Sequence, residues 1–169
     1  EAKLVEAPRV EQLPIVPESQ PKPSTTNSED SLRALIQRSP QAAYMLAEEA
    51  IFKRLANEFG SKIQREVRVD GPDGRYIFDG IVRDKGITTV IEVKVLRSSL
   101  LSAMQLRQTL VRIKHAAQVE PLEHGGSFRV LLALAIGREN QSTDKVLSQI
   151  NRIRDEFPFP IEVRFYPLD

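Results

Sequence analysis

The segment YIFDGIVRDKGITTVIEVKVL, residues 76–96, constrains the fold of this chain more than any other. Its β-branched and aromatic residues alternate on both sides of the turn residues Asp-Lys-Gly, a pattern typical of two β-strands joined by a tight turn. Asp79, Glu92 and Lys94 interrupt the apolar pattern. Burying an ionised side chain costs hydration free energy, so charges in a core hairpin need partners or a task. The segment therefore predicts a sheet whose interior carries charged groups.

The patterns around this hairpin predict an α/β fold. We expect helices at 28–38, 40–59, 99–118 and 143–156, and strands at 62–69, 75–83, 87–96, 128–137 and 161–167. Ser39 and Pro40 are typical of a helix start, and Gly60 of a helix end. A three-stranded meander followed by two crossover units predicts a mixed β-sheet flanked by helices.

Length and composition predict one folded domain, residues 28–169, preceded by a disordered arm. The chain has 169 residues, which suits one domain with a real core. Residues 1–27 contain five prolines and no sustained periodicity, as in a linker, with a short partner-binding motif as the alternative. The net charge of +1 divides unevenly, because residues 1–30 carry three basic and six acidic side chains and the remainder is at +4.

Several classes of site are excluded by composition. The chain has no cysteine and two histidines, which argues against disulfides, thiolate zinc sites and thiol nucleophiles. Any metal ion would be held by carboxylates, which favours Mg²⁺ or Mn²⁺. Without an apolar run of membrane-spanning length or a signal peptide, we expect a cytoplasmic protein without membrane contact of its own. An anchor in a segment preceding Glu1 stays open.

The hairpin register decides whether its charges meet. If residues 83–86 form the turn, Asp79 lies opposite Val90, and the period of two places Asp79, Glu92 and Lys94 on one face. Asp79 and Glu92 are then diagonal neighbours about 7–8 Å apart, so that one divalent cation fits between their carboxylates. A slip of one residue would send Asp79 to the other face.

The helix at 40–59 offers a further acid. Glu48 falls near the centre of its apolar stripe, whereas Glu49 lies toward the edge, so we favour Glu48. If this helix packs on the hairpin face that carries the charges, Glu48 approaches the same ion directly or through a water. The alternative is a glutamate that reaches out to solvent. The stripe consists of Tyr44, Ala47, Ile51 and Leu55.

Asp79, followed after twelve intervening residues by Glu92-Val93-Lys94 in a frame of helix, three strands, helix and strand, resembles the PD-(D/E)XK nuclease superfamily. The resemblance covers residues 40 to about 137 and implies the restriction-endonuclease-like fold. It also implies that Asp79, Glu92 and the main-chain carbonyl of Val93 bind Mg²⁺ or Mn²⁺. Lys94 would position or activate the attacking water, and Glu48 would assist. Phe78 stands where the name of the superfamily has proline.

A second interpretation of the same residues needs no catalysis. Glu92 and Lys94 could form an ion pair on one face of an exposed edge strand, with Asp79-Gly80 marking a β-bulge.

The helix predicted at 99–118 follows the Glu-x-Lys strand directly. From residue 97 to residue 119 every charged side chain is basic, which suits contact with a phosphate backbone; a solvated helix face is the alternative. Which of the two glutamines contacts substrate is left open. The candidate nucleic-acid-binding residues are Arg97, Gln105, Arg107, Gln108, Arg112 and Lys114.

Together these features predict a Mg²⁺-dependent DNA endonuclease. The sequence does not distinguish DNA from RNA as the substrate. Cleavage of both strands often requires two active sites, so we expect a homodimer. The alternative is a catalytically inactive module of the same fold that binds nucleic acid or a protein within a larger assembly.

Overall fold

The computed structural model describes residues 39–71, 74–96, 102–124, 126–137 and 143–168. The predicted arm, the predicted helix at 28–38 and Arg97 lie outside these residues. The elements in the described part are α2 Pro40–Phe59, the 3-10 turn η1 Gly60–Lys62, β1 Ile63–Gly71, β2 Gly74–Asp84, β3 Ile87–Leu96, α3 Ala103–His124, β4 Ser127–Gly137, α4 Thr143–Arg154 and β5 Ile161–Leu168.

The strands form one five-stranded mixed sheet in the order β1-β2-β3-β4-β5. Strands β1, β2 and β3 pair antiparallel, whereas β3, β4 and β5 pair parallel. The predicted α/β fold with a mixed sheet flanked by helices is confirmed. The strand of the Glu-x-Lys motif, β3, is central rather than at an edge, so the exposed-edge part of the second interpretation is wrong, whereas its ion pair between Glu92 and Lys94 is present.

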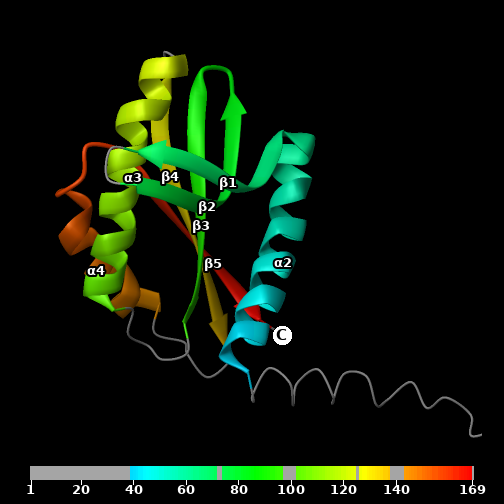
Figure 1. Cartoon of the computed structure of the whole chain (residues 1–169). Helices are drawn as coiled ribbons and strands as arrows, with labels where there is room; N and C mark the ends of the chain where they lie inside the picture. The colour runs from blue at the N-terminus through cyan, green and yellow to red at the C-terminus, as the bar shows by residue number, and fades with distance from the viewer. Residues whose placement is uncertain (1–38, 72–73, 97–101, 125, 138–142, 169) are drawn as a thin grey trace, which may run out of the picture.

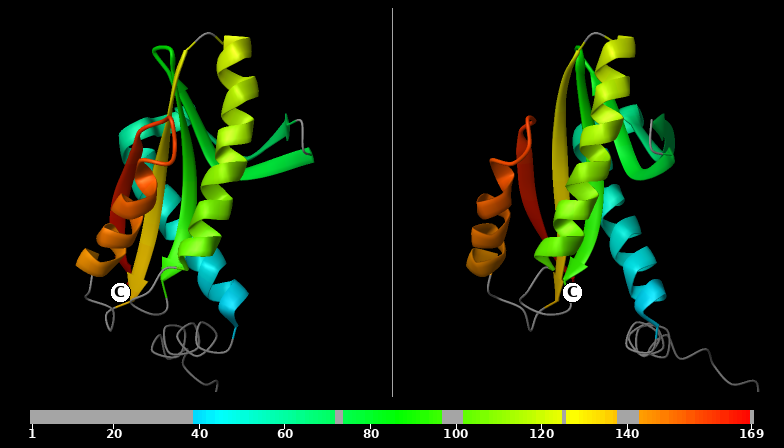
Figure 2. Two further views of the ribbon diagram at one scale, coloured as in Figure 1. Left: turned by 90° about the vertical axis from the view of Figure 1, so that its left-hand side faces the viewer. Right: turned by 60° about the vertical axis from the view of Figure 1, so that its left-hand side comes forward.

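Helices cover both faces of the sheet, as Figures 1 and 2 show: α2 lies on one face, and α3 and α4 lie on the other. Each face has its own apolar core. Alternate residues of β3 enter the two cores, because successive side chains of a strand point to opposite faces: Val90 packs with α3 and α4, and Ile91 and Val93 pack with α2. Burial therefore fixes the face of every β3 side chain.

The helix boundaries follow local signals where these are strong. The Ser39 hydroxyl accepts a hydrogen bond from the Ala42 N–H at 3.3 Å, and Gly60 at φ 60° ends α2, both as predicted. The predicted end of α3 at residue 118 is wrong, because the helix continues to His124. The sequence places Gly125 and Gly126 directly after that residue, and glycine is the usual residue at a helix end.

The register of the β2–β3 hairpin differs by two residues from the prediction. Asp84 pairs with Ile87 and Ile81 with Val90, so the turn is the two-residue Lys85-Gly86 rather than the four residues 83–86. Both turn residues have positive φ, 49° and 74°, as a type I′ turn requires. A shift of two residues keeps the side chains of the paired residues on their predicted faces. Continued by one residue, the register places Asp79 level with Glu92, not diagonal to it.

At this level the β1–β2 hairpin separates from the sheet. The β2–β3 pairing ends at Gly80 and Ile91, and the β1–β2 ladder is interrupted between Arg65–Gly80 and Val67–Phe78, where Glu66 has φ 51°. Figure 2 shows the distal part of this hairpin standing away from the main sheet. Asp79 thus lies where β2 leaves β3.

Gly80 is required by close packing at this point. A Cβ on Gly80 would lie 2.7 Å from the buried ring of Phe52. We expect Gly80→Ala to lower the free energy of unfolding by about 1–3 kcal/mol, the usual cost of overpacking a core. Urea denaturation measures this, with Gly137→Ala as the control, since a Cβ there meets nothing within 4 Å. Equal stability of the two variants would contradict the packing argument.

Candidate active site

Asp79 joins three elements at the point where β2 leaves β3. Its Oδ2 accepts a hydrogen bond from the Val93 N–H of β3 at 2.8 Å and another from the Tyr44 hydroxyl of α2 at 3.1 Å. The side chain thus replaces the backbone ladder that ends one residue earlier. The same Tyr44 hydroxyl lies 3.4 Å from the Val93 carbonyl oxygen.

Glu92 and Lys94 follow the alternation of β3 onto the face covered by α3 and α4. The Glu92 side chain is 8% exposed, and its Oε2 lies 3.5 Å from Lys94 Nζ. Lys94 is more accessible, with 29% of its side chain exposed. Glu92 is therefore a buried carboxylate with one nearby ammonium, that of Lys94, which is itself partly exposed to solvent.

The environment of Glu92 favours its neutral form. Burial and then the negative charge of Asp79 raise the pKa of the Glu92 carboxyl from 4.5 to about 7, against the opposing charges of Lys94 and Arg112. The register of β2 and β3, continued by one residue, places Asp79 level with Glu92, which accounts for the influence of its charge. Asp79, Glu92 and Lys94 thus form one electrostatic group, and α3 contributes Arg112 to its surroundings.

Glu48 does not share the face of Glu92. Helix α2 packs against Ile91 and Val93, on the face of the sheet opposite the Glu92 side chain, so the condition for Glu48 to approach the ion on that face is not met, although α2 reaches Asp79 through Tyr44. The Glu48 side chain is 13% exposed and bound by Arg65 of β1 at 2.9 Å, so it does not reach out to solvent either. Arg65 also pairs with the exposed Glu49 at 2.7 Å.

Sequence patterns do not indicate the polar contacts that two residues of this region, Tyr44 and Arg65, make in the structure. Tyr44 was assigned to an apolar stripe, although a half-buried tyrosine hydroxyl requires a polar partner. Arg65 lies on β1, and its guanidinium lies 4.4 Å from the centroid of the Phe52 ring while it binds two glutamates. Both residues contact partners far away in sequence, which local patterns do not reveal.

The donor atoms at the site suit a hard divalent cation. Two carboxylates and the main-chain carbonyl of Val93 are oxygen ligands of the kind Mg²⁺ takes. The raised pKa of Glu92 indicates that its charge is incompletely compensated, which a cation would correct. No group of three or more acidic or histidine side chains suited to a metal occurs among the described residues. The ion would thus depend on the two acids, one carbonyl and non-protein ligands.

The exposed face of α3 carries most of the candidate nucleic-acid-binding residues. Arg107, Gln108 and Arg112 line a pocket of about 610 Å³, together with Met104 and Val111. Arg107 is also bound by both carboxylate oxygens of Glu156, at 2.7 and 2.8 Å, which reduces the charge it offers to a phosphate. Gln105 is exposed and Lys114 half-buried on the same helix.

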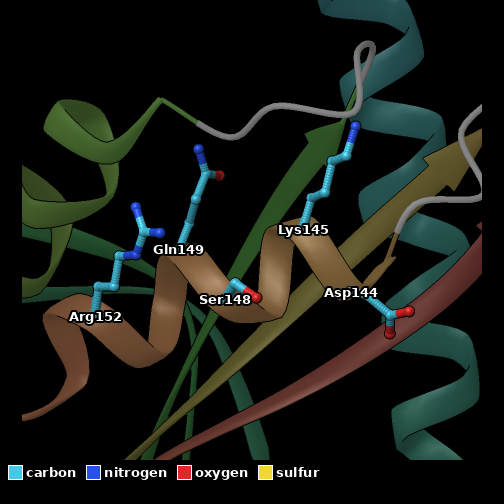
Figure 3. Close-up of a pocket in the computed structure, with 5 residues that line it drawn as sticks. All are labelled: Asp144, Lys145, Ser148, Gln149 and Arg152. Atoms are coloured by element: carbon cyan, nitrogen blue, oxygen red, sulfur yellow. The ribbon is translucent and has the colours of Figure 1, made fainter.

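A second pocket, of about 370 Å³, lies along α4 and brings no catalytic groups together. In Figure 3 Lys145, Gln149 and Arg152 extend to one side of the helix, whereas Asp144 points to the other. Their polar ends do not converge on a common point, so this pocket offers no grouping of acid and base.

Comparisons with known proteins leave the family of this chain open. No protein-family model and no curated protein sequence matches it. The crystal structure of a protein of unknown function, AF1548, is similar with a TM-score of 0.46 and 16% sequence identity. The match covers 72% of this chain and 57% of that chain, so it spans little more than half of the other protein.

Among the described helices, none combines the length and the apolar character that a membrane span requires.

Proposed function

We propose that this chain is a Mg²⁺-dependent DNA endonuclease of the PD-(D/E)XK superfamily. The observation that carries the proposal is the grouping of Asp79, Glu92 and Lys94 where β2 leaves β3, with Lys94 Nζ 3.5 Å from Glu92 Oε2. A buried acid with a raised pKa beside a second acid and an ammonium is typical of a functional site rather than of a sheet interior.

Each group has a role in phosphodiester hydrolysis. Asp79, Glu92 and the Val93 carbonyl would hold the ion, which when bound supplies a Lewis acid for the phosphate and a more acidic water. Lys94 would hold the attacking water and stabilise negative charge that develops on the phosphate oxygens. Arg112 and Gln108 of α3 would contact the phosphate backbone. A homodimer would bring two such sites to the two strands.

One observation favours the second candidate, a binding module without catalysis. The Tyr44 hydroxyl reaches both Asp79 Oδ2 and the Val93 carbonyl, and Arg65 holds Glu48. The Tyr44 hydroxyl and the Arg65 guanidinium therefore already bind oxygen atoms that a metal ion would otherwise bind. A module of this kind would bind nucleic acid at α3 and cut none.

Asp79→Asn separates the two candidates. The amide oxygen of asparagine still accepts hydrogen bonds from Val93 N–H and Tyr44, so the fold is retained, but the negative charge that binds the cation is lost. With plasmid DNA and Mg²⁺, we expect the cleavage rate to fall by at least about 100-fold, as the loss of several kcal/mol of metal-assisted stabilisation implies. Gel electrophoresis of DNA and RNA substrates, with and without chelator, measures the rate.

Asp70→Asn is the matched control. Asp70 is also an aspartate of the β1–β2 hairpin, but its side chain is 81% exposed and paired with Arg75. The Asp70→Asn variant should cleave plasmid DNA at the wild-type rate. Cleavage by Asp79→Asn at the rate of Asp70→Asn would reject the enzyme, and DNA binding without cleavage by all three proteins would establish the binding module.

A further inference from the structure

The Tyr44 hydroxyl connects two groups that the proposed function assigns to the metal ion. It donates to Asp79 Oδ2 at 3.1 Å and lies 3.4 Å from the carbonyl oxygen of Val93. The Val93 N–H donates to the same Oδ2 at 2.8 Å. One carboxylate oxygen of Asp79 is thus held by a helix on one side and a strand on the other.

This arrangement leaves the two oxygens of Asp79 in different states. Oδ2 accepts two hydrogen bonds, whereas Oδ1 accepts none from the residues that the structure describes. A carboxylate fixed through one oxygen presents the other in a defined direction. Such partners of a metal-binding carboxylate orient it and influence how tightly it binds the ion.

Tyr44 is suited to remain a donor. Its hydroxyl faces two acceptors, Asp79 Oδ2 at 3.1 Å and the Val93 carbonyl oxygen at 3.4 Å. Tyr44 comes from the N-terminal half of α2, whose position is fixed by the buried Ala43, Ala47 and Ile51. The hydroxyl is therefore delivered to Asp79 by a packed helix.

We propose that Tyr44 is a positioning residue of the metal site: its hydroxyl fixes the Asp79 carboxylate against Val93, and the affinity for the divalent cation depends on this bond. The inference rests on the proposed function, because it takes Asp79 and Val93 as ligands. A tyrosine that serves packing alone would contribute to stability through its ring and leave metal affinity unchanged.

Tyr44→Phe tests the inference, since it removes the hydroxyl and keeps the ring. Calorimetric titration of the full chain with Mn²⁺ measures the affinity, and we expect Kd to rise by about 10-fold, the lower end of the effect of losing such a partner. Urea denaturation without metal measures the stability of the same variant. Asp79→Asn is titrated in parallel and should bind Mn²⁺ far more weakly than either protein.

Terbium emission tests a separate premise, that the cation binds beside Tyr44. The chain has three tyrosines and no tryptophan, so Tb³⁺ emission excited through the protein reports a nearby tyrosine. Tyr44→Phe should lose most of this emission at saturating Tb³⁺, whereas Tyr166→Phe, with its ring on β5 beside Arg54, should keep it.

The outcomes distinguish failure of the proposed metal site from failure of the proposed role of Tyr44. Wild-type Mn²⁺ affinity in Asp79→Asn would overturn the proposed metal site itself. Weak binding by Asp79→Asn with wild-type affinity in Tyr44→Phe would overturn the role of Tyr44 and leave the site standing. Reduced Mn²⁺ affinity in Tyr44→Phe with unchanged affinity in Tyr166→Phe would support the role of Tyr44, and the loss of Tb³⁺ emission in Tyr44→Phe alone would place the ion beside it.

Discussion

Replacing Lys94 with methionine is expected to slow DNA cleavage by at least about 100-fold, within the range that a positioned acid–base group contributes to catalysis. The Lys94 ammonium lies 3.5 Å from the buried Glu92 carboxylate and is the most exposed member of that pair. It is thus placed to meet a phosphate or a water that enters from the surface. The substitution removes the charge at the end of an otherwise similar chain.

Methionine keeps most of the apolar stem of lysine, so the packing of β3 should persist. With only 29% of the Lys94 side chain exposed, a shorter residue would leave a gap beside Glu92. The rate is measured with plasmid DNA and Mg²⁺ at saturating substrate. Circular dichroism establishes that the variant is folded.

Lys145→Met is the control for a general loss of positive charge. Lys145 is exposed on α4 and lines the pocket along that helix. If DNA is attracted by net charge alone, both variants should lose activity equally, and the catalytic role of Lys94 would be contradicted. If Lys94 acts at the site, Lys145→Met should cleave at nearly the wild-type rate.

The fold was predictable because its local signals agree with its tertiary packing. Ser39, Pro40 and Gly60 mark both ends of α2, and the alternation of β3 marks which side chains are buried. The face shared by Glu92 and Lys94 was predictable for the same reason, since it depends only on the period of two. A hairpin register wrong by two residues still preserves that face.

The parts of the site that were missed depend on the backbone conformation of one turn and on contacts between distant segments. The type I′ turn at Lys85-Gly86 required positive φ at a lysine, which the sequence does not favour as strongly as Asn-Gly. The side of the sheet on which α2 packs is not encoded in its own apolar stripe, which fits either face. The partner of Glu48 is Arg65, seventeen residues away on a strand that leaves the sheet.

A pH-dependent stability is the second expected effect, and Glu92 is its source. Burial and Asp79 raise the pKa of the Glu92 carboxyl from 4.5 to about 7 in the folded protein, whereas the unfolded chain titrates near 4.5. The folded state therefore binds a proton more tightly than the unfolded state does. The stability that this proton contributes is complete below about pH 4.5 and is lost as the pH rises through about 7.

Glu92→Gln should remove this dependence. Since the difference between 4.5 and about 7 corresponds to roughly 3 kcal/mol, the variant should unfold with a free energy up to about 3 kcal/mol higher than the wild type at pH 8 in chelator. At pH 4 the two proteins should be nearly equal. Urea denaturation between pH 4 and pH 8 measures the free energy of unfolding of both proteins. Groups that titrate in both contribute equally, so their effect drops out of the difference between the two free energies.

Glu49→Gln provides the control, because that glutamate is 70% exposed and should leave the shape of the pH profile unchanged. Mg²⁺ extends the test to the metal site. A cation that binds the ionised Glu92 stabilises the folded wild type at pH 8 and narrows its difference from Glu92→Gln. If the free energy of unfolding of the wild type does not change between pH 4.5 and 7, Glu92 does not carry a buried, incompletely compensated charge. The metal site and its chemistry, which were inferred from that charge, would then be contradicted.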